Sequence, residues 1–174
     1  MKPGGQGKPD RTRSNIVRLI WCATGSAIGI GLALWLAEAP SSPFILASLG
    51  GSTVFLFGLT GADAAQPRAL FGGHLGSAAI GVLCFQAFGN LLWVSILAVV
   101  LSFVFMMATR TVHPPVGANP LIMVQGHAGF YALWHPVGLG VLILALVAVV
   151  WSRLIPGMDH YPVNWLAKSP HSIL

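Results

Sequence analysis

The chain has 174 residues, of which 55% are hydrophobic and only 7% are charged, and its mean hydropathy is +0.78. A soluble domain carries roughly 25% charged residues. This chain therefore cannot cover a water-facing surface, and we expect one integral membrane domain. The net charge of +5 comes largely from the N-terminal region, which is also compatible with nucleic-acid binding. In a membrane protein a basic tail instead predicts topology, because Lys and Arg beside a span hold that end in the cytoplasm.

The first apolar stretch, residues 19–37, follows this basic tail and ends in Ala37-Glu38-Ala39, an order that also resembles a signal peptide. A stretch of 19 residues is long for a signal core and long enough to cross a bilayer. We therefore interpret 19–37 as the first membrane span. Cys22 and Cys84 both lie in apolar stretches, which favours buried thiols over a disulfide framework.

The rest of the chain divides into three further windows without Asp, Glu, Lys or Arg, and a charge in the bilayer core is costly. The window 39–62 is long enough for one crossing, and the windows 69–109 and 111–152 for two each. Gly89-Asn90 divides the first long window, and Gly126-His127-Ala128-Gly129 divides the second. The remaining predicted spans are 69–88, 91–109, 111–126 and 130–152.

The distribution of Lys and Arg supports six crossings, because this count places every basic residue in the cytoplasm with the N-terminus. Trp35, Trp93 and Trp134 then lie at the outer interface, and Trp21 and Trp151 at the inner one. The alternative has four spans, with 43–60 and 111–126 as re-entrant segments, and leaves Arg68 and Arg110 outside.

We therefore predict an all-α, polytopic membrane helical bundle of about six segments, two of them short or broken. The membrane domain is predicted at 15–155, between a flexible basic tail at 1–14 and a C-terminal tail at 156–174. Both the basic tail and the positive-inside pattern predict a cytoplasmic N-terminus.

The two halves of the chain follow a similar order, which favours an internal repeat. Each half has a long helix, a proline, a Gly-rich bend, a short apolar stretch, a polar residue before proline and another long helix. The bends are Gly50-Gly51-Ser52-Thr53 and Gly117-Ala118-Asn119-Pro120, and the later pairs are Gln66-Pro67 and His135-Pro136. Three crossings per half would invert the halves, an architecture that recurs among transporters. Two unrelated kinks are the alternative, since Gly and Pro are common in membrane helices.

The segment 109–127 has the strongest helix-breaking signals in the chain. Proline clashes with a preceding helical turn and makes the residue before it extended. Pro114 and Pro115 therefore predict extended Val112 and His113, a helix beginning near Pro115, and a second interruption at Pro120. Such a segment must be buried in protein or line a wet cavity. A helix beginning inside the membrane presents free N–H groups, which suits an anion.

Three polar residues in apolar surroundings are candidates for substrate contact. His113 is an anion contact, a proton-linked gate, or an interfacial histidine bonded to a backbone carbonyl. Asn119 either contacts substrate through its amide or caps the broken helix. His74 lies among the small residues Gly72, Gly73 and Gly76, which permit close helix approach or access to a ligand.

The other polar residues carry weaker signals. Arg68 and Arg110 either attract substrate or only anchor the topology. The histidine spacing matches no compact metal site, so no metal is expected. The sequence contains no nucleophile–base arrangement, phosphate loop or HExxH motif, so neither an enzyme nor a cofactor is predicted.

The sequence resembles the HPP family of integral membrane proteins, named for the tripeptide His113-Pro114-Pro115. The resemblance extends from 15 to 155 and includes Gly50 to Val54, Gln66 to Leu75, and Thr109 to Ala118. It implies a small multi-span protein, usually described with four spans, and some cyanobacterial and chloroplast relatives are linked to nitrite transport. Some bacterial relatives carry a CBS domain that this chain lacks, and Asn119-Pro120 departs from the small or hydroxyl residue expected there.

These observations predict a transporter or channel for a small inorganic anion, with nitrite first, in a bacterial inner membrane. The alternative is a non-transporting scaffold or regulatory subunit. Apart from the anion, the lipid bilayer is the expected partner, nucleic acid is not expected, and self-association is left open. The predicted substrate-binding residues are Gly51, Ser52, Thr53, Arg68, His74, Arg110, His113, Gly117 and Asn119.

Overall fold

The computed structural model describes residues 11–37, 47–154 and 159–169, with side chains from Asn15 onward. This part of the chain is helical and contains no strand, as predicted. The first half comprises α1 (Arg11–Leu36), α2 (Ala47–Thr53), η2 (Val54–Gly58), η3 (Asp63–Ala65) and α3 (Pro67–Phe88). The second half comprises α4 (Leu92–Thr109), η4 (Pro114–Ala118), α5 (Asn119–Gln125), η5 (Leu133–Gly138) and α6 (Leu139–Trp151).

Four helices have the length and hydropathy needed to cross a membrane: Asn15–Leu36, Pro67–Phe88, Leu92–Thr109 and Leu133–Trp151. They match the predicted first, third, fourth and sixth segments. The second and fifth segments are short, as predicted: α2 and η2 form one apolar helix, Ala47–Gly58, and the fifth segment is η4 followed by α5. α1 begins at Arg11, inside the range predicted as a tail.

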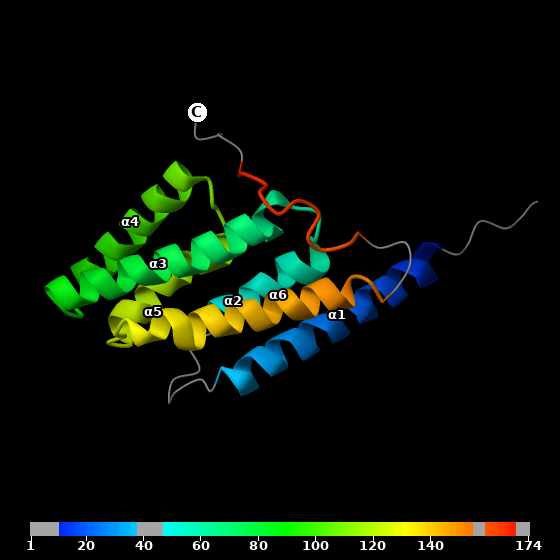
Figure 1. The fold of residues 1–174 in the computed structure, drawn as a ribbon, viewed down its shortest axis with the longest axis horizontal. Coiled ribbons are helices and arrows are strands. Elements are labelled where there is room, and N and C mark those ends of the chain that lie inside the picture. The colour runs from blue at the N-terminus through cyan, green and yellow to red at the C-terminus, as the bar shows by residue number, and fades with distance from the viewer. Residues whose placement is uncertain (1–10, 38–46, 155–158, 170–174) are drawn as a thin grey trace, which may run out of the picture.

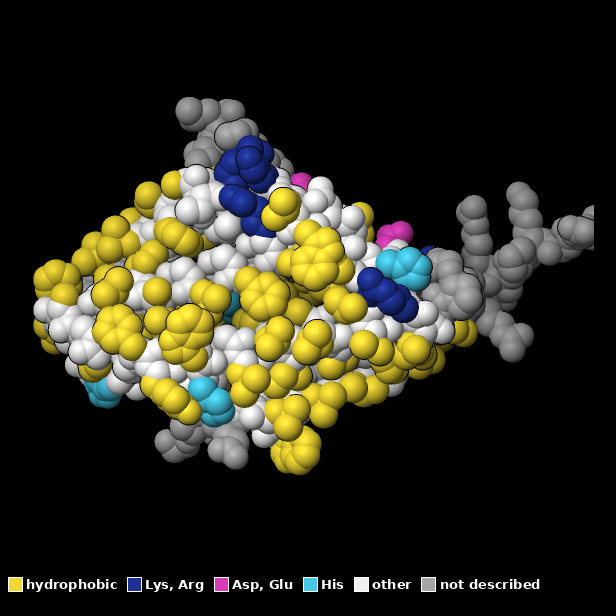
Figure 2. All heavy atoms as spheres, in the orientation of Figure 1, with side chains coloured by type: hydrophobic (Ala, Val, Ile, Leu, Met, Phe, Trp, Pro, Cys, Tyr) yellow, Lys and Arg dark blue, Asp and Glu magenta, His cyan; other side chains and the backbone are white. Residues whose placement is uncertain are grey.

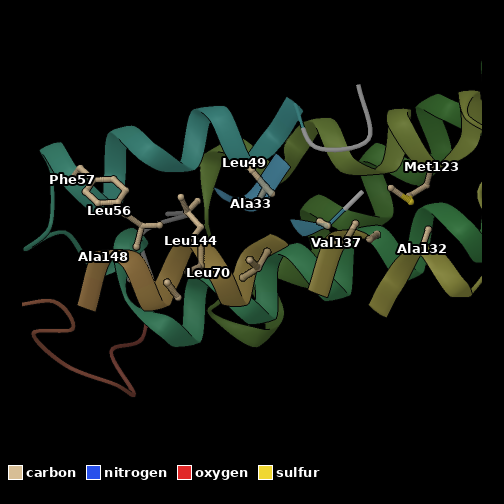
Figure 3. Close-up of a cluster of buried hydrophobic side chains, with 14 of the residues drawn as sticks. Ala33, Leu49, Leu56, Phe57, Leu70, Met123, Ala132, Val137, Leu144 and Ala148 are labelled. Atoms are coloured by element: carbon tan, nitrogen blue, oxygen red, sulfur yellow. The ribbon is translucent and has the colours of Figure 1, made fainter. Parts of the chain in front are cut away.

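The two short segments lie alongside the long helices, and the contacts at their ends show how far each extends. Thr111 lies two residues after the end of α4, and His127, at the other end of the fifth segment, contacts Asn90 in the turn before α4. In the second segment, Leu49 lies beside Ala33, whereas Phe57 lies close to Ala148 near the opposite end (Figure 3). Each short segment thus has its two ends at different levels of the bundle, while four helices are long enough to cross a membrane.

Corresponding helices in the two halves have corresponding packing partners. In the first half α1 packs on α2, and in the second α4 packs on α5; likewise, α3 packs on α4 as α6 packs on α1. The contact of α3 with α5 is matched by that of α6 with α2, and α2 meets η4 at the centre. α1 and α4 run in opposite directions, as the predicted inverted repeat requires (Figure 1). Pro43, the proline that precedes the Gly-rich bend in the first half of the predicted repeat, lies outside the described residues.

One end of the bundle, here called the basic end, collects the described Lys and Arg side chains. Arg68 bonds to the Thr109 carbonyl, Arg110 to Ser169, and Arg153 to the Tyr161 carbonyl. Trp21 and Trp151 stack at this end with ring centroids 4.1 Å apart. In Figure 2 the dark-blue side chains lie toward the top and right of the molecule, and yellow side chains cover most of the remaining visible face.

The main core is a row of small and aliphatic side chains between α1, α2, α3 and α6 (Figure 3). Leu49, Leu56, Val141 and Leu144 are at most 2% exposed. Many large side chains on the outside of the helices are exposed, including Leu92 and Trp134. An apolar exterior of this kind is suited to lipid rather than water.

Candidate functional site

A glycine-lined face of α3 allows the fifth segment to pack closely against it. A Cβ atom on Gly73 would lie 3.1 Å from the Thr111 carbonyl oxygen and 3.2 Å from the His113 Cβ. Farther along α3, a Cβ atom on Gly81 would lie 2.9 Å from the Pro120 Cα. Small residues thus provide the close helix approach that the sequence predicted. As a result, His113 and Asn119 lie directly against α3.

The backbone at His113 is extended, as its position before two prolines predicts, with φ −130° and ψ 99°. η4 then begins at Pro114 as a 3₁₀ helix of five residues. Its first two residues lack an N–H group, and the Val116 N–H donates to the His113 carbonyl. The predicted free N–H groups for an anion are therefore not present, which corrects that part of the sequence interpretation.

The predicted interruption at Pro120 is also wrong. Pro120 lies in the first turn of α5, where a missing N–H group costs nothing, because the first helical N–H groups have no partner within the helix. Ala118 and Asn119 both have right-handed helical angles, so η4 passes directly into α5. The break in the fifth segment is thus the extended stretch before Pro114.

A buried polar cluster forms where the second and fifth segments meet α3. The Ser52 hydroxyl lies 2.9 Å from His74 Nε2 and 2.8 Å from His113 Nε2. Asn119 Nδ2 lies 3.1 Å from the His74 carbonyl oxygen and 3.2 Å from the Ser77 hydroxyl. The cluster has six members, none more than 4% exposed: Ser48, Ser52, His74, Ser77, His113 and Asn119. His74 lies seven residues into the 22-residue α3, about 10 Å along it.

The partners of the two imidazoles determine where their hydrogens lie. His113 Nδ1 is 2.5 Å from the Ala64 carbonyl oxygen, which can only accept, so this nitrogen carries a hydrogen. His74 Nδ1 is 3.3 Å from the Asn119 amide nitrogen, which can only donate, so neutral His74 carries its hydrogen on Nε2. In the neutral cluster His74 therefore donates to Ser52, and Ser52 donates to His113.

This geometry is accompanied by a family match: the model of the HPP transmembrane region matches residues 11–162. The chain belongs to the HPP transmembrane family. This HPP protein is similar to two transmembrane proteins of Dictyostelium discoideum. One is 34% identical over 93% of this chain and 55% of its own length; the other is 36% identical over 70% and 45%. The HPP protein thus spans about half the length of these relatives, and no solved structure matches it.

Four of the predicted binding residues meet in the polar cluster: Ser52, His74, His113 and Asn119. The other predicted residues of the bends lie outside it. The Thr53 hydroxyl donates to the Gly50 carbonyl of its own helix. Gly51 packs on Pro115, because a Cβ atom added to Gly51 would lie 3.0 Å from the Pro115 Cβ. A Cβ atom added to Gly117 would have no neighbour within 4 Å. Successive side chains on a helix point in different directions, so the motifs alone could not show which of their residues lie in the cluster and which lie outside it.

The two predicted arginines lie at the basic end, and both are held by backbone carbonyls. Arg68 Nη2 donates to the Thr109 carbonyl oxygen at 2.8 Å. Arg68 lies six residues before His74 on α3, which is about 9 Å along the helix. Arg110 Nε donates to the Ser169 carbonyl at 2.9 Å, and the Ser169 hydroxyl accepts from the Val112 N–H. The C-terminal segment 159–169 of the HPP protein is thus tied down beside His113.

The other tether of this C-terminal segment lies near α3 and α6. The side-chain amide oxygen of Gln66 accepts from the N–H groups of Val163 and Asn164. The Ser152 hydroxyl accepts from the Tyr161 N–H, and burial raises the pKa of the Tyr161 side chain. The segment therefore covers the basic end between two anchored positions, a role that its sequence did not suggest.

Sequence reasoning missed Ser48, Ser77 and the Ala64 carbonyl. Spacing offered a signal for the first two, because Ser48 lies four residues before Ser52 and Ser77 three residues after His74, so each pair shares a helix face. The Ala64 carbonyl had no such signal, since only the tertiary fold brings the loop before α3 to His113. Among the described residues, no group of three or more His, Cys, Asp or Glu could hold a metal ion.

A hollow of about 520 Å³ opens at the basic end between α1, η2 and the C-terminal segment. Its lining includes Arg18, Cys22, Asp159 and the stretch 57–62. No member of the polar cluster lines it, but Ala64, the carbonyl partner of His113, lies two residues beyond its lining. The stretch 60–64 thus adjoins the hollow at one end and the cluster at the other.

Proposed function

We propose that this HPP protein is a transporter for a small inorganic anion, with nitrite as the leading substrate. The observation that carries the proposal is the position of the polar cluster at the junction of two short, oppositely directed segments. Transporters built from inverted repeats bind substrate between interrupted helices of the two halves, near the middle of the membrane. The cluster lies between the second and fifth segments, which supports the comparison.

The chemistry of the cluster favours an anion over a cation. Hydroxyl, imidazole and amide groups can all donate hydrogen bonds, and the cluster contains no carboxylate. The two described carboxylates, Asp63 and Asp159, are both exposed. Burying polar groups in a membrane domain costs free energy, so such groups usually have a function, and these can replace the hydration of an anion. We therefore assign substrate contact to Ser52, His74, His113 and Asn119.

The described arrangement corresponds to a closed state, because the donor groups of the cluster are bonded to one another. An anion has to replace some of these bonds, most simply those around the Ser52 hydroxyl. The hollow at the basic end provides the approach, with Arg18 on its wall. We place the basic end in the cytoplasm of a bacterial inner membrane, following the distribution of Lys and Arg.

Flux measurements in proteoliposomes test the proposal. Purified protein should carry nitrite, nitrate or chloride into vesicles faster than protein-free vesicles do. His113→Ala should lower the initial rate at least about tenfold, because a hydrogen bond to a charged group contributes about 1.5–3 kcal/mol. The matched control is His127→Ala, since His127 lies at the opposite end, where it bonds to Asn90 outside the cluster.

The control variant should keep its rate within about twofold, while both variants should elute as monodisperse protein. Folded wild-type protein that carries none of the three anions at any pH would contradict the proposal. Equal losses in the two variants would also contradict it, because the effect would then not depend on the cluster.

A further inference from the structure

The Ser52 hydroxyl has one hydrogen and three potential partners, and this mismatch has a chemical consequence. Besides the two imidazole nitrogens, its oxygen lies 3.0 Å from the Ser48 carbonyl. In the neutral cluster the hydroxyl hydrogen points to His113, so the Ser48 carbonyl, 3.0 Å from the Ser52 hydroxyl oxygen, receives no hydrogen from this hydroxyl. The cluster therefore holds a spare acceptor within hydrogen-bonding distance.

The spare acceptor allows His113 to take up a proton without leaving any of these bonds unmade. A proton added to His113 Nε2 turns this nitrogen into a donor toward Ser52. The Ser52 hydroxyl hydrogen then rotates to the Ser48 carbonyl, while its oxygen accepts from His74 and His113. His113 Nδ1 keeps its bond to Ala64 in both states. The two protonation states thus differ by one hydroxyl rotation.

The surroundings limit the cluster to one proton. The His74 and His113 ring centroids are 5.4 Å apart, so a second proton would place two like charges in contact. Other ionisable groups on the adjoining elements are committed elsewhere: Arg68 bonds to Thr109, Arg110 bonds to Ser169, and Asp63 of η3 is exposed. No described carboxylate neutralises a charged His113.

We propose that the polar cluster binds one proton together with the anion and that this HPP protein carries both across the membrane. The inference rests on the proposed function. A buried imidazolium without a counter-ion is costly, and an anion beside it supplies the missing charge. Each ligand therefore raises the affinity for the other by the same factor. The pair is electroneutral when the proton enters at His113 Nε2 and leaves from it on the opposite side.

The first experiment measures both ions in proteoliposomes that contain a pH indicator. A nitrate gradient should acidify the interior with one proton per anion and generate no membrane potential. Nitrate is preferred to nitrite here, because nitrous acid crosses lipid unaided. Anion entry that creates a potential without acidification would overturn the inference while leaving the proposed function intact.

The matched variants are Ser52→Ala and Thr53→Ala, which remove neighbouring hydroxyls of the same short helix. Ser52→Ala should reduce coupled uptake at least about tenfold, because the protonated His113 loses its Nε2 partner. Thr53→Ala should keep both the rate and the ratio, since its hydroxyl bonds only within α2. Equal behaviour of the two variants would count against a role for the Ser52 bridge.

The second experiment needs no transport and therefore separates the two proposals. The protonation of His113 is followed by nitrogen-15 NMR in detergent, with its signal assigned by comparison with His113→Gln. Because the anion stabilises the protonated form, the midpoint should move to higher pH when nitrate is added. A tenfold coupling corresponds to about one pH unit. An unchanged midpoint at saturating nitrate would overturn the inference, even if flux is observed.

Discussion

The two halves of this HPP protein contribute equivalent helix junctions of opposite chemistry. In one, α3 packs on the fifth segment and contributes His74 and Ser77 to the polar cluster. In the other, α6 packs on α2 with Val141 and Leu144, which belong to the apolar core. The backbone arrangement is shared, but only the α3 junction contains buried ionisable groups.

This difference shows how a symmetric membrane fold can hold a single site. Repetition of the helix packing stabilises both junctions, whereas polar side chains are confined to one of them. Buried polar groups cost free energy in a membrane unless they are satisfied, so a second copy of the cluster would need its own partners. We therefore expect substitutions at the α6 junction to affect stability and those at the α3 junction to affect transport.

The largest effect is expected where α3 meets α5. Gly81→Leu should prevent stable folding, because even the first added carbon would lie 2.8 Å from the Met123 Cβ and 2.9 Å from the Pro120 Cα. Overpacking typically costs about 1–3 kcal/mol, and more when backbone atoms must move. Gly31→Leu is the control, since nothing lies within 4 Å of its hypothetical Cβ. The measurement is the monodisperse fraction in detergent; equal recovery of both variants would contradict close packing at α3.

Exchanging residue types between the junctions should give the next largest effects. Leu144→Asn buries an amide in the apolar junction and should lower the free energy of unfolding by about 3 kcal/mol. Asn119→Leu should cost only about 1 kcal/mol, because the side-chain amide oxygen of Asn119 is buried without a hydrogen-bond partner and the substitution removes it. The same variant should nevertheless reduce anion flux at least about tenfold. Thermal unfolding measures the two stabilities, and anion flux measures function. A larger loss of stability in Asn119→Leu than in Leu144→Asn, or a larger loss of flux in Leu144→Asn, would contradict the proposed difference between the junctions.

The smallest effect concerns the two tethers of the C-terminal segment. Ser169→Ala removes the acceptor of the Val112 N–H and should accelerate hydrogen exchange of that amide about fivefold, for a local loss near 1 kcal/mol. Ser152→Ala removes the acceptor of the Tyr161 N–H and should leave exchange at Val112 unchanged. If both variants accelerate exchange at Val112, the segment moves as one unit and the tethers are not independent.

The sequence alone was sufficient to predict the membrane bundle, its six segments and the grouping of basic residues at one end. These features depend on local composition: apolar length, helix-breaking residues and the high cost of charge in lipid. The resemblance to HPP proteins was likewise carried by contiguous motifs, and these motifs include His113, which its position before two prolines had already made a candidate. The prediction of free N–H groups at the start of this helix was wrong, because the 3₁₀ geometry of η4 satisfies the first available N–H group locally.

Only the tertiary structure decided which of these candidates meet. Ser52, His74 and His113 are separated by up to 61 residues, and their contact depends on the glycine face of α3 and the crossing of α2 with η4. The same packing excludes Thr53, although it is adjacent to Ser52, because neighbouring residues on a helix point in different directions. Long-range packing also placed Ser169 beside Val112, a contact that no local pattern in the sequence encodes.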